Sequence, residues 1–93
     1  MKTLDEIMAT LRAQKPFLFH EYGVREIGVF GSYVRSEQKP DSDLDILIEF
    51  ERPTHIGLEN YLSDLLGVKV DLFIRKNLKR RIGQHILQEV ITL

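Results

Sequence analysis

Two aspartates one residue apart, at the start of an apolar run, place the strongest constraint on how this chain can fold. Residues 43–50 alternate carboxylates and Leu47 with a second set of purely apolar residues, Leu44, Ile46, Ile48 and Phe50. Side chains point to opposite faces of a strand with a period of two. The segment therefore predicts a strand with one apolar face and one face that carries Asp43, Asp45 and Glu49.

A pair of carboxylates on one face has a chemical consequence. Two ionised carboxylates about 4 Å apart repel by roughly 4 kcal/mol at an effective dielectric constant of about 20. A divalent cation between them removes this cost. Mg²⁺ prefers oxygen ligands, and one or two protein carboxylates commonly hold it together with substrate phosphates. Asp43 and Asp45 are therefore candidate ligands of Mg²⁺.

Gly31-Ser32 follows an apolar run at 24–30 and precedes the aspartates. A glycine turn that opens a short helix, expected at 32–36, presents free backbone N–H groups and the positive end of a helix dipole. Such a turn suits an anionic phosphate. The sequence thus places a candidate phosphate site before a candidate metal site.

The spacing of these motifs resembles a known signature. Gly31-Ser32, ten residues and then Asp43-Leu44-Asp45 is similar to the Gly-Ser-x10-Asp-x-Asp pattern of the nucleotidyltransferase superfamily that includes DNA polymerase beta. The short length, with Tyr33-Val34-Arg35 after the Gly-Ser, resembles its smallest members, the minimal nucleotidyltransferase (MNT) family. Asp71, in Val70-Asp71-Leu72, matches the third carboxylate of that family. Ser36 departs from it, because many relatives have a glycine there.

The resemblance implies roles for these residues. Asp43, Asp45 and Asp71 are expected to be catalytic and to hold one or two Mg²⁺ ions, and Gly31 and Ser32 to hold the terminal phosphates of ATP. Ser42 and Arg35 are further candidates for nucleotide binding. A guanidinium suits a carboxylate as well as a phosphate, so an ordinary surface salt bridge stays open for Arg35.

The resemblance also implies a partner and a reaction. Family members of this size are typically encoded beside a HEPN protein, a ribonuclease toxin, and act as its antitoxin by transferring AMP to a tyrosine of the toxin. We therefore expect a protein adenylyltransferase antitoxin that forms a hetero-oligomer with a toxin encoded nearby. Two alternatives remain: an antitoxin that acts by occlusion alone, and a nucleotidyltransferase that modifies a small molecule or an RNA end.

Length and composition limit the number of domains and the classes of partner that we expect. Ninety-three residues predict a single domain over 1–93, and a formal net charge of -1 gives no general attraction to nucleic acid. The chain has no cysteine and no apolar run of about 18 residues, so we expect a cytoplasmic protein that does not span a membrane.

Hydrophobic periodicity predicts an α/β fold. Thr3-Leu4-Asp5-Glu6 is typical of a capping box that starts a helix. Pro16 predicts a break near 14–16, followed by a second short helix that ends at Gly23. The remaining expected elements are strands at 24–30, 43–50 and 68–74, a connector at 52–54, and helices at about 56–66 and 78–90. We expect a small, mostly three-stranded mixed sheet with helices on one face and the carboxylates on the other.

Other features carry less information. The basic residues near 75–81 predict a solvated helix face, or else a docking patch for an acidic partner or polyphosphate; they are Arg75, Lys76, Lys79, Arg80 and Arg81. His20, His55 and His85 lack metal-ligand spacing. Tyr33 is expected to be a packing residue or to edge the nucleotide pocket.

Overall fold

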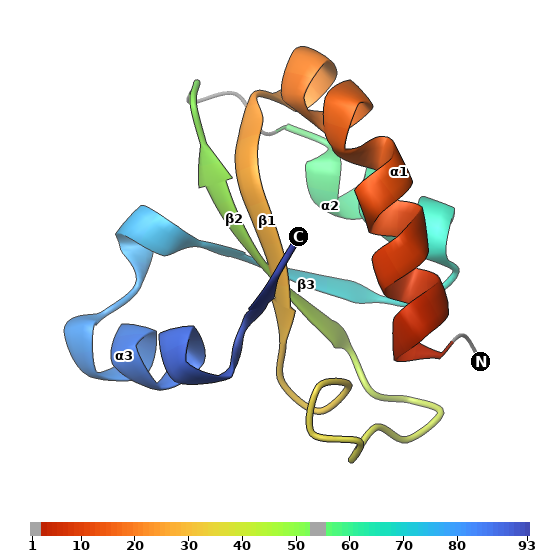
Figure 1. Ribbon diagram of the computed structural model, residues 1–93, viewed down its shortest axis with the longest axis vertical. Coiled ribbons are helices and arrows are strands. Elements are labelled where there is room, and N and C mark those ends of the chain that lie inside the picture. Colours follow the sequence, from red (N-terminus) through yellow and green to blue (C-terminus); the bar gives the residue numbers. More distant parts are fainter. Residues whose placement is uncertain (1–2, 53–55) are drawn as a thin grey trace.

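The computed structural model describes residues 3–52 and 56–93 and has the expected α/β architecture (Figure 1). Its helices are α1 (Leu4–Tyr22), α2 (Leu58–Leu66), α3 (Arg80–Glu89) and the 3₁₀ helix η1 (Arg75–Asn77). Its strands are β1 (Val24–Phe30), β2 (Leu44–Phe50), β3 (Val70–Ile74) and β4 (Ile91–Thr92). The sheet order is β3-β2-β1-β4. β1 is antiparallel to β2 and β4, and β2 is parallel to β3, which confirms a mixed sheet.

Helix α1 begins and ends as the sequence predicts. The Thr3 side chain accepts a hydrogen bond from the Glu6 N–H, and the Glu6 carboxylate accepts one from the Thr3 N–H. This is the capping box, and Gly23 closes the helix in the left-handed conformation, with φ of 70°. The expected break at Pro16 is wrong, because the helix runs through it. Ile7, Leu11 and Leu18, which lie on both sides of the proline, are fully buried in one core, so their packing outweighs the missing hydrogen bond.

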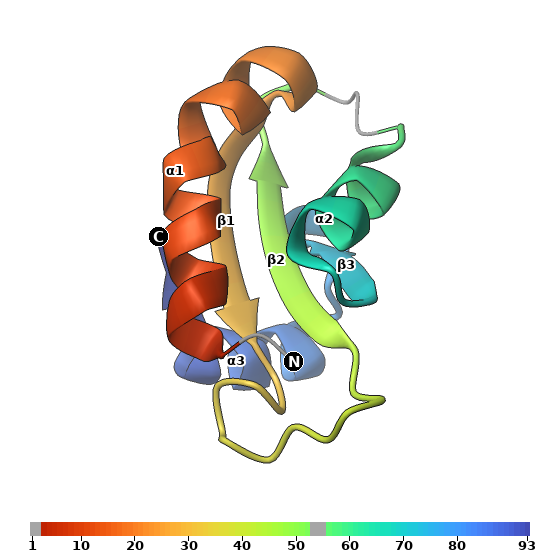
Figure 2. The same ribbon diagram turned by 90° about the vertical axis from the view of Figure 1, so that its right-hand side faces the viewer.

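The main core lies between the sheet and the pair α1 and α2, which cover one face (Figure 2). The sheet contributes the apolar residues that alternate with the aspartates, including Leu44, Ile46 and Ile48, all fully buried. Helix α2 connects β2 to β3, as a parallel pair requires, and ends at Gly67 with φ of 69°. The predicted apolar face of 43–50 is therefore confirmed.

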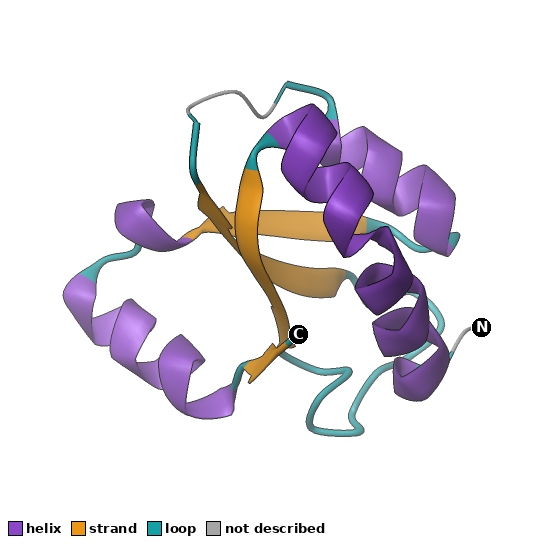
Figure 3. Ribbon diagram, turned by 45° about the horizontal axis from the view of Figure 1, so that its top comes forward, coloured by secondary structure: helices purple, strands orange, loops and turns teal. Residues whose placement is uncertain are grey.

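Helix α3 lies on the other side of the sheet (Figure 3). Ile86 of α3 forms a second, smaller core with Phe30 and Leu47, which belong to the face that carries the aspartates. The expectation that helices cover a single face is therefore correct for α1 and α2 and wrong for α3. Leu47 and Phe30 supply the reason, because they are apolar residues on the carboxylate face and need cover.

Strand β4 was not expected from the sequence. Its two residues pair with Gly28 and Val29 of β1, and the Leu93 N–H donates to the Ile27 carbonyl. Lys15 of α1 donates to the Leu93 carbonyl at 2.8 Å. The C-terminal residues are thus joined to the sheet and to α1. Two residues are too few to show an alternating pattern.

At the opposite end of the sheet order, β3 is bonded to α2 by side chains. The Val70 N–H donates to the Ser63 hydroxyl at 3.0 Å, and the Leu72 N–H donates to the Glu59 carboxylate at 3.2 Å.

Smaller differences concern element ends. Residues 32–36 form a turn and not a helix. β1 spans 24–30 as expected, whereas β2, β3, α2 and α3 start one or two residues later than expected. Pro53, Thr54 and His55, which include most of the predicted connector, lie outside the described residues. In the part of the chain that the structure describes, no helix is long and apolar enough to cross a membrane.

Pro16→Ala is expected to stabilise the protein. The proline is exposed within α1, so alanine restores a helical hydrogen bond without removing core packing. Proline in a helix interior costs about 3 kcal/mol, and its stiffening of the unfolded chain returns up to about 1 kcal/mol. We expect a gain of about 1–2 kcal/mol in urea unfolding. Glu21→Ala, an exposed substitution in the same helix, is the control and should change stability by less than about 0.5 kcal/mol. An unchanged or less stable Pro16→Ala protein would contradict this account.

Candidate functional site

The predicted aspartates gather at one end of the sheet. Asp45 and Asp71 are register partners on the parallel strands β2 and β3. Asp43 lies just before β2, and its carboxylate is 3.9 Å from the Lys69 ammonium. Asp43 and Asp45 are partly buried, whereas Asp71 is exposed. Residues from two strands separated by a helix thus meet as the sequence predicts.

Gly31 lies directly against Asp45. β1 and β2 place Phe30 opposite Asp45, and the chain then turns at Gly31 with φ of 86°. A Cβ atom at Gly31 would stand 2.1 Å from the Asp45 Oδ2 atom. Glycine is required here twice, once for the left-handed backbone and once for the approach of the carboxylate.

The turn after Gly31 is closed by its own backbone. The Val34 and Arg35 N–H groups donate to the Gly31 carbonyl, and the Glu37 N–H donates to the Ser32 carbonyl. Ser36 has φ of 58°, a region that favours glycine, so the glycine that the family resemblance leads one to expect here would fit this backbone. Tyr33 is 2% exposed and belongs to the main core, so it is a packing residue.

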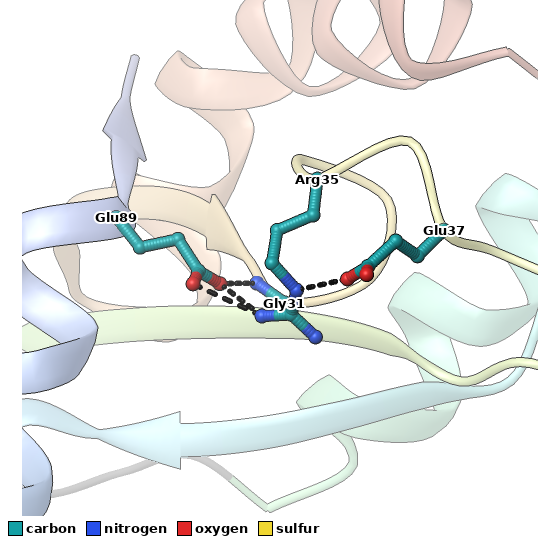
Figure 4. A network of polar contacts seen from close by, with 4 residues as sticks. All are labelled: Gly31, Arg35, Glu37 and Glu89. Carbon is teal, nitrogen blue, oxygen red and sulfur yellow. Dashed lines mark hydrogen bonds and ion pairs between the residues drawn. The ribbon is translucent and has the colours of Figure 1, made fainter.

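Arg35 joins two glutamates, one of which the sequence analysis missed (Figure 4). Its Nη1 atom donates to both carboxylate oxygens of Glu89, at 2.8 and 2.9 Å, and its Nε atom donates to Glu37 at 2.5 Å. Of the two interpretations open for Arg35, the structure contains the ion pair. Glu89 also accepts a hydrogen bond from the Gly31 N–H at 2.5 Å.

Glu89 could not be found by local pattern. It is 58 residues from Gly31 in sequence, and only the pairing of the short strand β4 with β1 brings it there. Burial alone would raise the pKa of Glu89, but the hydrogen bond from the Gly31 N–H and the Arg35 guanidinium hold that pKa below its ordinary value.

Ser42 has a local role in the loop before β2. Its hydroxyl accepts a hydrogen bond from the Lys39 N–H at 2.8 Å, and its own N–H donates to the Lys39 carbonyl at 2.9 Å. These bonds close a turn just before Asp43. The observed contacts of Ser42 therefore fix the loop, and its binding to nucleotide stays a prediction.

The electrostatics of the site centre on Asp45. Burial first, and then the charges of Asp71 and Asp43, together raise the pKa of its carboxyl to about 6, against the lowering effect of Arg35. An ionised Asp45 is therefore costly without a cation.

The donor set fits a hard divalent ion, because carboxylate oxygens on adjacent positions repel one another and are the ligands that Mg²⁺ prefers. The side chains do not form a closed cage: within residues 3–52 and 56–93, no group of three or more His, Asp or Glu side chains is gathered tightly enough to hold a metal. Mg²⁺ commonly binds through one or two carboxylates and completes its ligands with substrate phosphates and water. The arrangement is consistent with that mode of binding.

The rest of the carboxylate face serves structure. Arg75, from the predicted basic cluster, contacts Glu26 at 3.5 Å and Glu49 at 3.3 Å, so it ties β1 and β2 to the end of β3. Near these residues a cleft of about 540 Å³ is lined by both acidic and basic side chains, including Glu51, Arg52 and Lys76. It lies at the other end of β2 from Asp45 and contains none of the three aspartates.

Comparison with known proteins identifies the family. Residues 11–92 match the nucleotidyltransferase domain family. The chain belongs to this family. The protein adenylyltransferase MntA of Thermococcus cleftensis is 53% identical to it over 95 residues, which cover 98% of this chain and 96% of the relative. A protein of Methanocaldococcus jannaschii assigned by name to the protein adenylyltransferases is 52% identical over 93 residues, covering 96% and 95%. The chain is therefore a nucleotidyltransferase, as its signature predicts.

Solved structures agree with this assignment. A structure described as a minimal nucleotidyltransferase superposes with a TM-score of 0.81 at 34% identity and covers 99% of this chain and 97% of its own. The MNT antitoxin in complex with a tri-AMPylated HEPN toxin of Shewanella oneidensis superposes with a TM-score of 0.58 at 21% identity, covering 95% of this chain and 66% of that one. The second likeness shows a shared fold.

The raised pKa of Asp45 predicts that Asp45→Asn changes the stability of the metal-free protein by an amount that depends on pH. In the unfolded chain this carboxyl has a pKa near 3.8, and in the folded protein near 6. The folded state therefore binds the proton more tightly, and the wild type loses stability as pH rises through this window. The full shift corresponds to about 3 kcal/mol, which solvent exposure reduces to about 1 kcal/mol.

We expect Asp45→Asn to be more stable than wild type by about 1 kcal/mol at pH 7.5, which is about 4–8 °C in melting temperature, and nearly equal at pH 4.5. Thermal melts in a chelator at both pH values check this. Asp41→Asn, an exposed change in the same loop, should show no such trend. A stability difference that does not vary with pH would contradict the role of Asp45.

Gly31→Ala and Gly57→Ala form a matched pair. Both glycines have φ above 80°, so both substitutions carry the backbone cost of about 1–2 kcal/mol. Only Gly31 meets a neighbour, since no atom of the described residues lies within 4 Å of a Cβ at Gly57. We expect Gly31→Ala to displace Asp45 and lower nucleotidyl transfer by more than about tenfold. Gly57→Ala should keep the wild-type rate, and equal rates in the two variants would argue against the contact with Asp45.

Proposed function

We propose that this nucleotidyltransferase transfers AMP from ATP to a tyrosine of a HEPN-type toxin and thereby neutralises it. In this proposal the toxin is encoded near the chain and forms a hetero-oligomer with it. The long matches to protein adenylyltransferases support protein as the acceptor class. A solved toxin-antitoxin complex with AMP-PNP, 23% identical with a TM-score of 0.68, has the same fold.

The observation that carries the proposal is the pairing of Asp45 with Asp71 across β2 and β3, next to the Gly31 turn. Asp43, Asp45 and Asp71 would hold Mg²⁺. When bound, the metal neutralises phosphate charge and stabilises the attacking and leaving oxygens of an in-line displacement. Asp45 would then be ionised, because a cation relieves the repulsion that raises its pKa.

The residues of the chain account for the remaining steps. Asp71 is exposed, so an acceptor hydroxyl can reach it from solvent. The tyrosine oxygen forms a bond to the α-phosphorus of ATP as the bond from that phosphorus to the α,β-bridging oxygen breaks, and pyrophosphate leaves. Asp71 receives the phenolic proton. Ser32 and the Gly31 turn position the terminal phosphates, and Arg35 offsets their charge.

The proposal predicts that label on the α-phosphate of ATP passes to a protein. Purified chain is incubated with labelled ATP, Mg²⁺ and an extract of the source cells, and products are separated by size and class. Wild type should label one protein, and mass spectrometry should place AMP on a tyrosine. Asp43→Asn and Asp45→Asn should lower the labelling by about 100-fold or more, because each removes charge that aligns the reacting groups. Asp41→Asn, in the same loop, should label like wild type.

Other outcomes separate the alternatives. Labelled RNA or a labelled small molecule, with no labelled protein, would favour a different acceptor. Neutralisation of the toxin by Asp43→Asn as complete as by wild type would favour occlusion without catalysis.

A further inference from the structure

Glu89 contacts the Gly31 turn, which lies against Asp45, and the proposed reaction gives this contact no role. Glu89 is the last residue of α3, and its side chain is only 15% exposed. It accepts from the Gly31 N–H and from Arg35 at once, so one carboxylate holds both ends of the turn that the sequence assigns to phosphate binding (Figure 4).

The backbone explains how Glu89 reaches this position. β4 runs antiparallel to β1, with Ile91 opposite Val29 and Thr92 opposite Gly28. Continuing this register by two residues brings Glu89 to Gly31, where β1 has ended and the chain turns away with positive φ. The Glu89 side chain thus accepts a hydrogen bond from the Gly31 N–H at the point where the backbone pairing of β1 and β4 ends.

The helix dipole of α3 does not favour a glutamate at position 89. An acidic side chain at the C-terminal end of a helix is disfavoured by the helix dipole, and α3 has no basic residue in its last turn. Glu89 is held instead by the charge of Arg35 and the Gly31 N–H. A partly buried carboxylate that is bonded on both oxygens is costly to move, because it would have to leave these partners.

The contact divides the candidate phosphate ligands into two groups. The Gly31 N–H is already bonded, whereas within the described chain neither the N–H nor the hydroxyl of Ser32 donates a hydrogen bond. Arg35 uses Nη1 and Nε for the two glutamates. Its Nη2 atom, drawn without a contact in Figure 4, extends away from Glu89.

We propose that Glu89 is a positioning residue for nucleotide transfer: it holds Gly31 and Arg35 so that Ser32 and the Arg35 Nη2 atom are the groups presented to the phosphates. This rests on the proposed function for the identity of the anion. It assigns Gly31 a conformational role and not the role of a phosphate donor. The opposite hypothesis is that the Glu89 carboxylate occupies the position of a phosphate and is displaced when the nucleotide binds.

The two readings give opposite signs in a binding experiment. Wild type, Glu89→Gln and Glu89→Ala are titrated with a non-hydrolysable ATP analogue and Mg²⁺, with no acceptor present. If Glu89 positions the turn, Glu89→Ala weakens binding by about tenfold or more. Glu89→Gln, which keeps an oxygen for the Gly31 N–H but loses the charge opposite Arg35, weakens it by about two- to threefold. If Glu89 is displaced, both variants remove a competing anion and bind the analogue more tightly.

Glu37→Gln is the matched control. The Glu37 side chain pairs with the same guanidinium, but it is 63% exposed. It contacts Arg35 and not the Gly31 N–H, whereas Glu89 contacts both. An exposed pair contributes little, so this variant should bind the analogue within about twofold of wild type. Weakening by Glu37→Gln as large as that by Glu89→Ala would overturn the proposal, as would unchanged or tighter binding in Glu89→Ala.

Two controls distinguish a failure of this proposal from misfolding and from a failure of the proposed function. Glutamine is nearly the same size as glutamate. A melting temperature of Glu89→Gln close to that of wild type, together with weakened binding, therefore excludes general unfolding as the cause. Analogue binding needs no acceptor, so it tests Glu89 even where no labelled protein is found. A partial return of affinity in Glu89→Gln relative to Glu89→Ala supports a positioning role, and equal loss in both contradicts it.

Discussion

Repulsion between carboxylates on neighbouring strands is the interaction on which the rest of the site depends. Asp45 and Asp71 stand side by side on β2 and β3, and the charges of Asp71 and Asp43 add to burial in raising the pKa of Asp45 to about 6. The opposite faces of the same strands hold the aspartates in place, because a slip of one residue would bury the carboxylates and expose Ile46 and Ile48. The free energy of the core thus maintains an unfavourable cluster of charge that a cation and a nucleotide can use.

The C-terminal segment completes this site from a distance. α3 covers Phe30 and Leu47 on the carboxylate face, β4 extends the sheet beside β1, and Glu89 between them fixes the Gly31 turn against Asp45. Each contact involves few residues. Together they link the last part of the chain to the loop that the signature motif defines, so the motif is assembled by residues outside itself.

Much of this could be predicted from the sequence, and the failures have physical causes. The alternation at 43–50, the capping box at Thr3 and the glycines at 23 and 67 are local patterns, and each formed as expected. The break at Pro16 did not, since burial of Ile7, Leu11 and Leu18 outweighs a local preference. β4 and Glu89 were missed because a two-residue strand and a side-chain contact across 58 residues leave no periodic signal. The placement of Asp45 against Gly31, with Asp71 as its register partner and Asp43 close enough for its charge to raise the Asp45 pKa, agrees with the signature, while the roles of the three aspartates stay predictions.

The side-chain bonds between α2 and β3 bear on how this protein can assemble. An exposed outer strand normally offers N–H groups that a strand of another chain can bond. Here Ser63 and Glu59 already accept from the Val70 and Leu72 N–H groups. Growth of the sheet past β3 would first have to break both bonds, which disfavours strand addition by a second protein beside Asp71. In the proposed reaction, a partner that brings a hydroxyl to Asp71 would therefore dock more readily through side chains than by adding a strand, and Asp71 would stay exposed until the acceptor arrives.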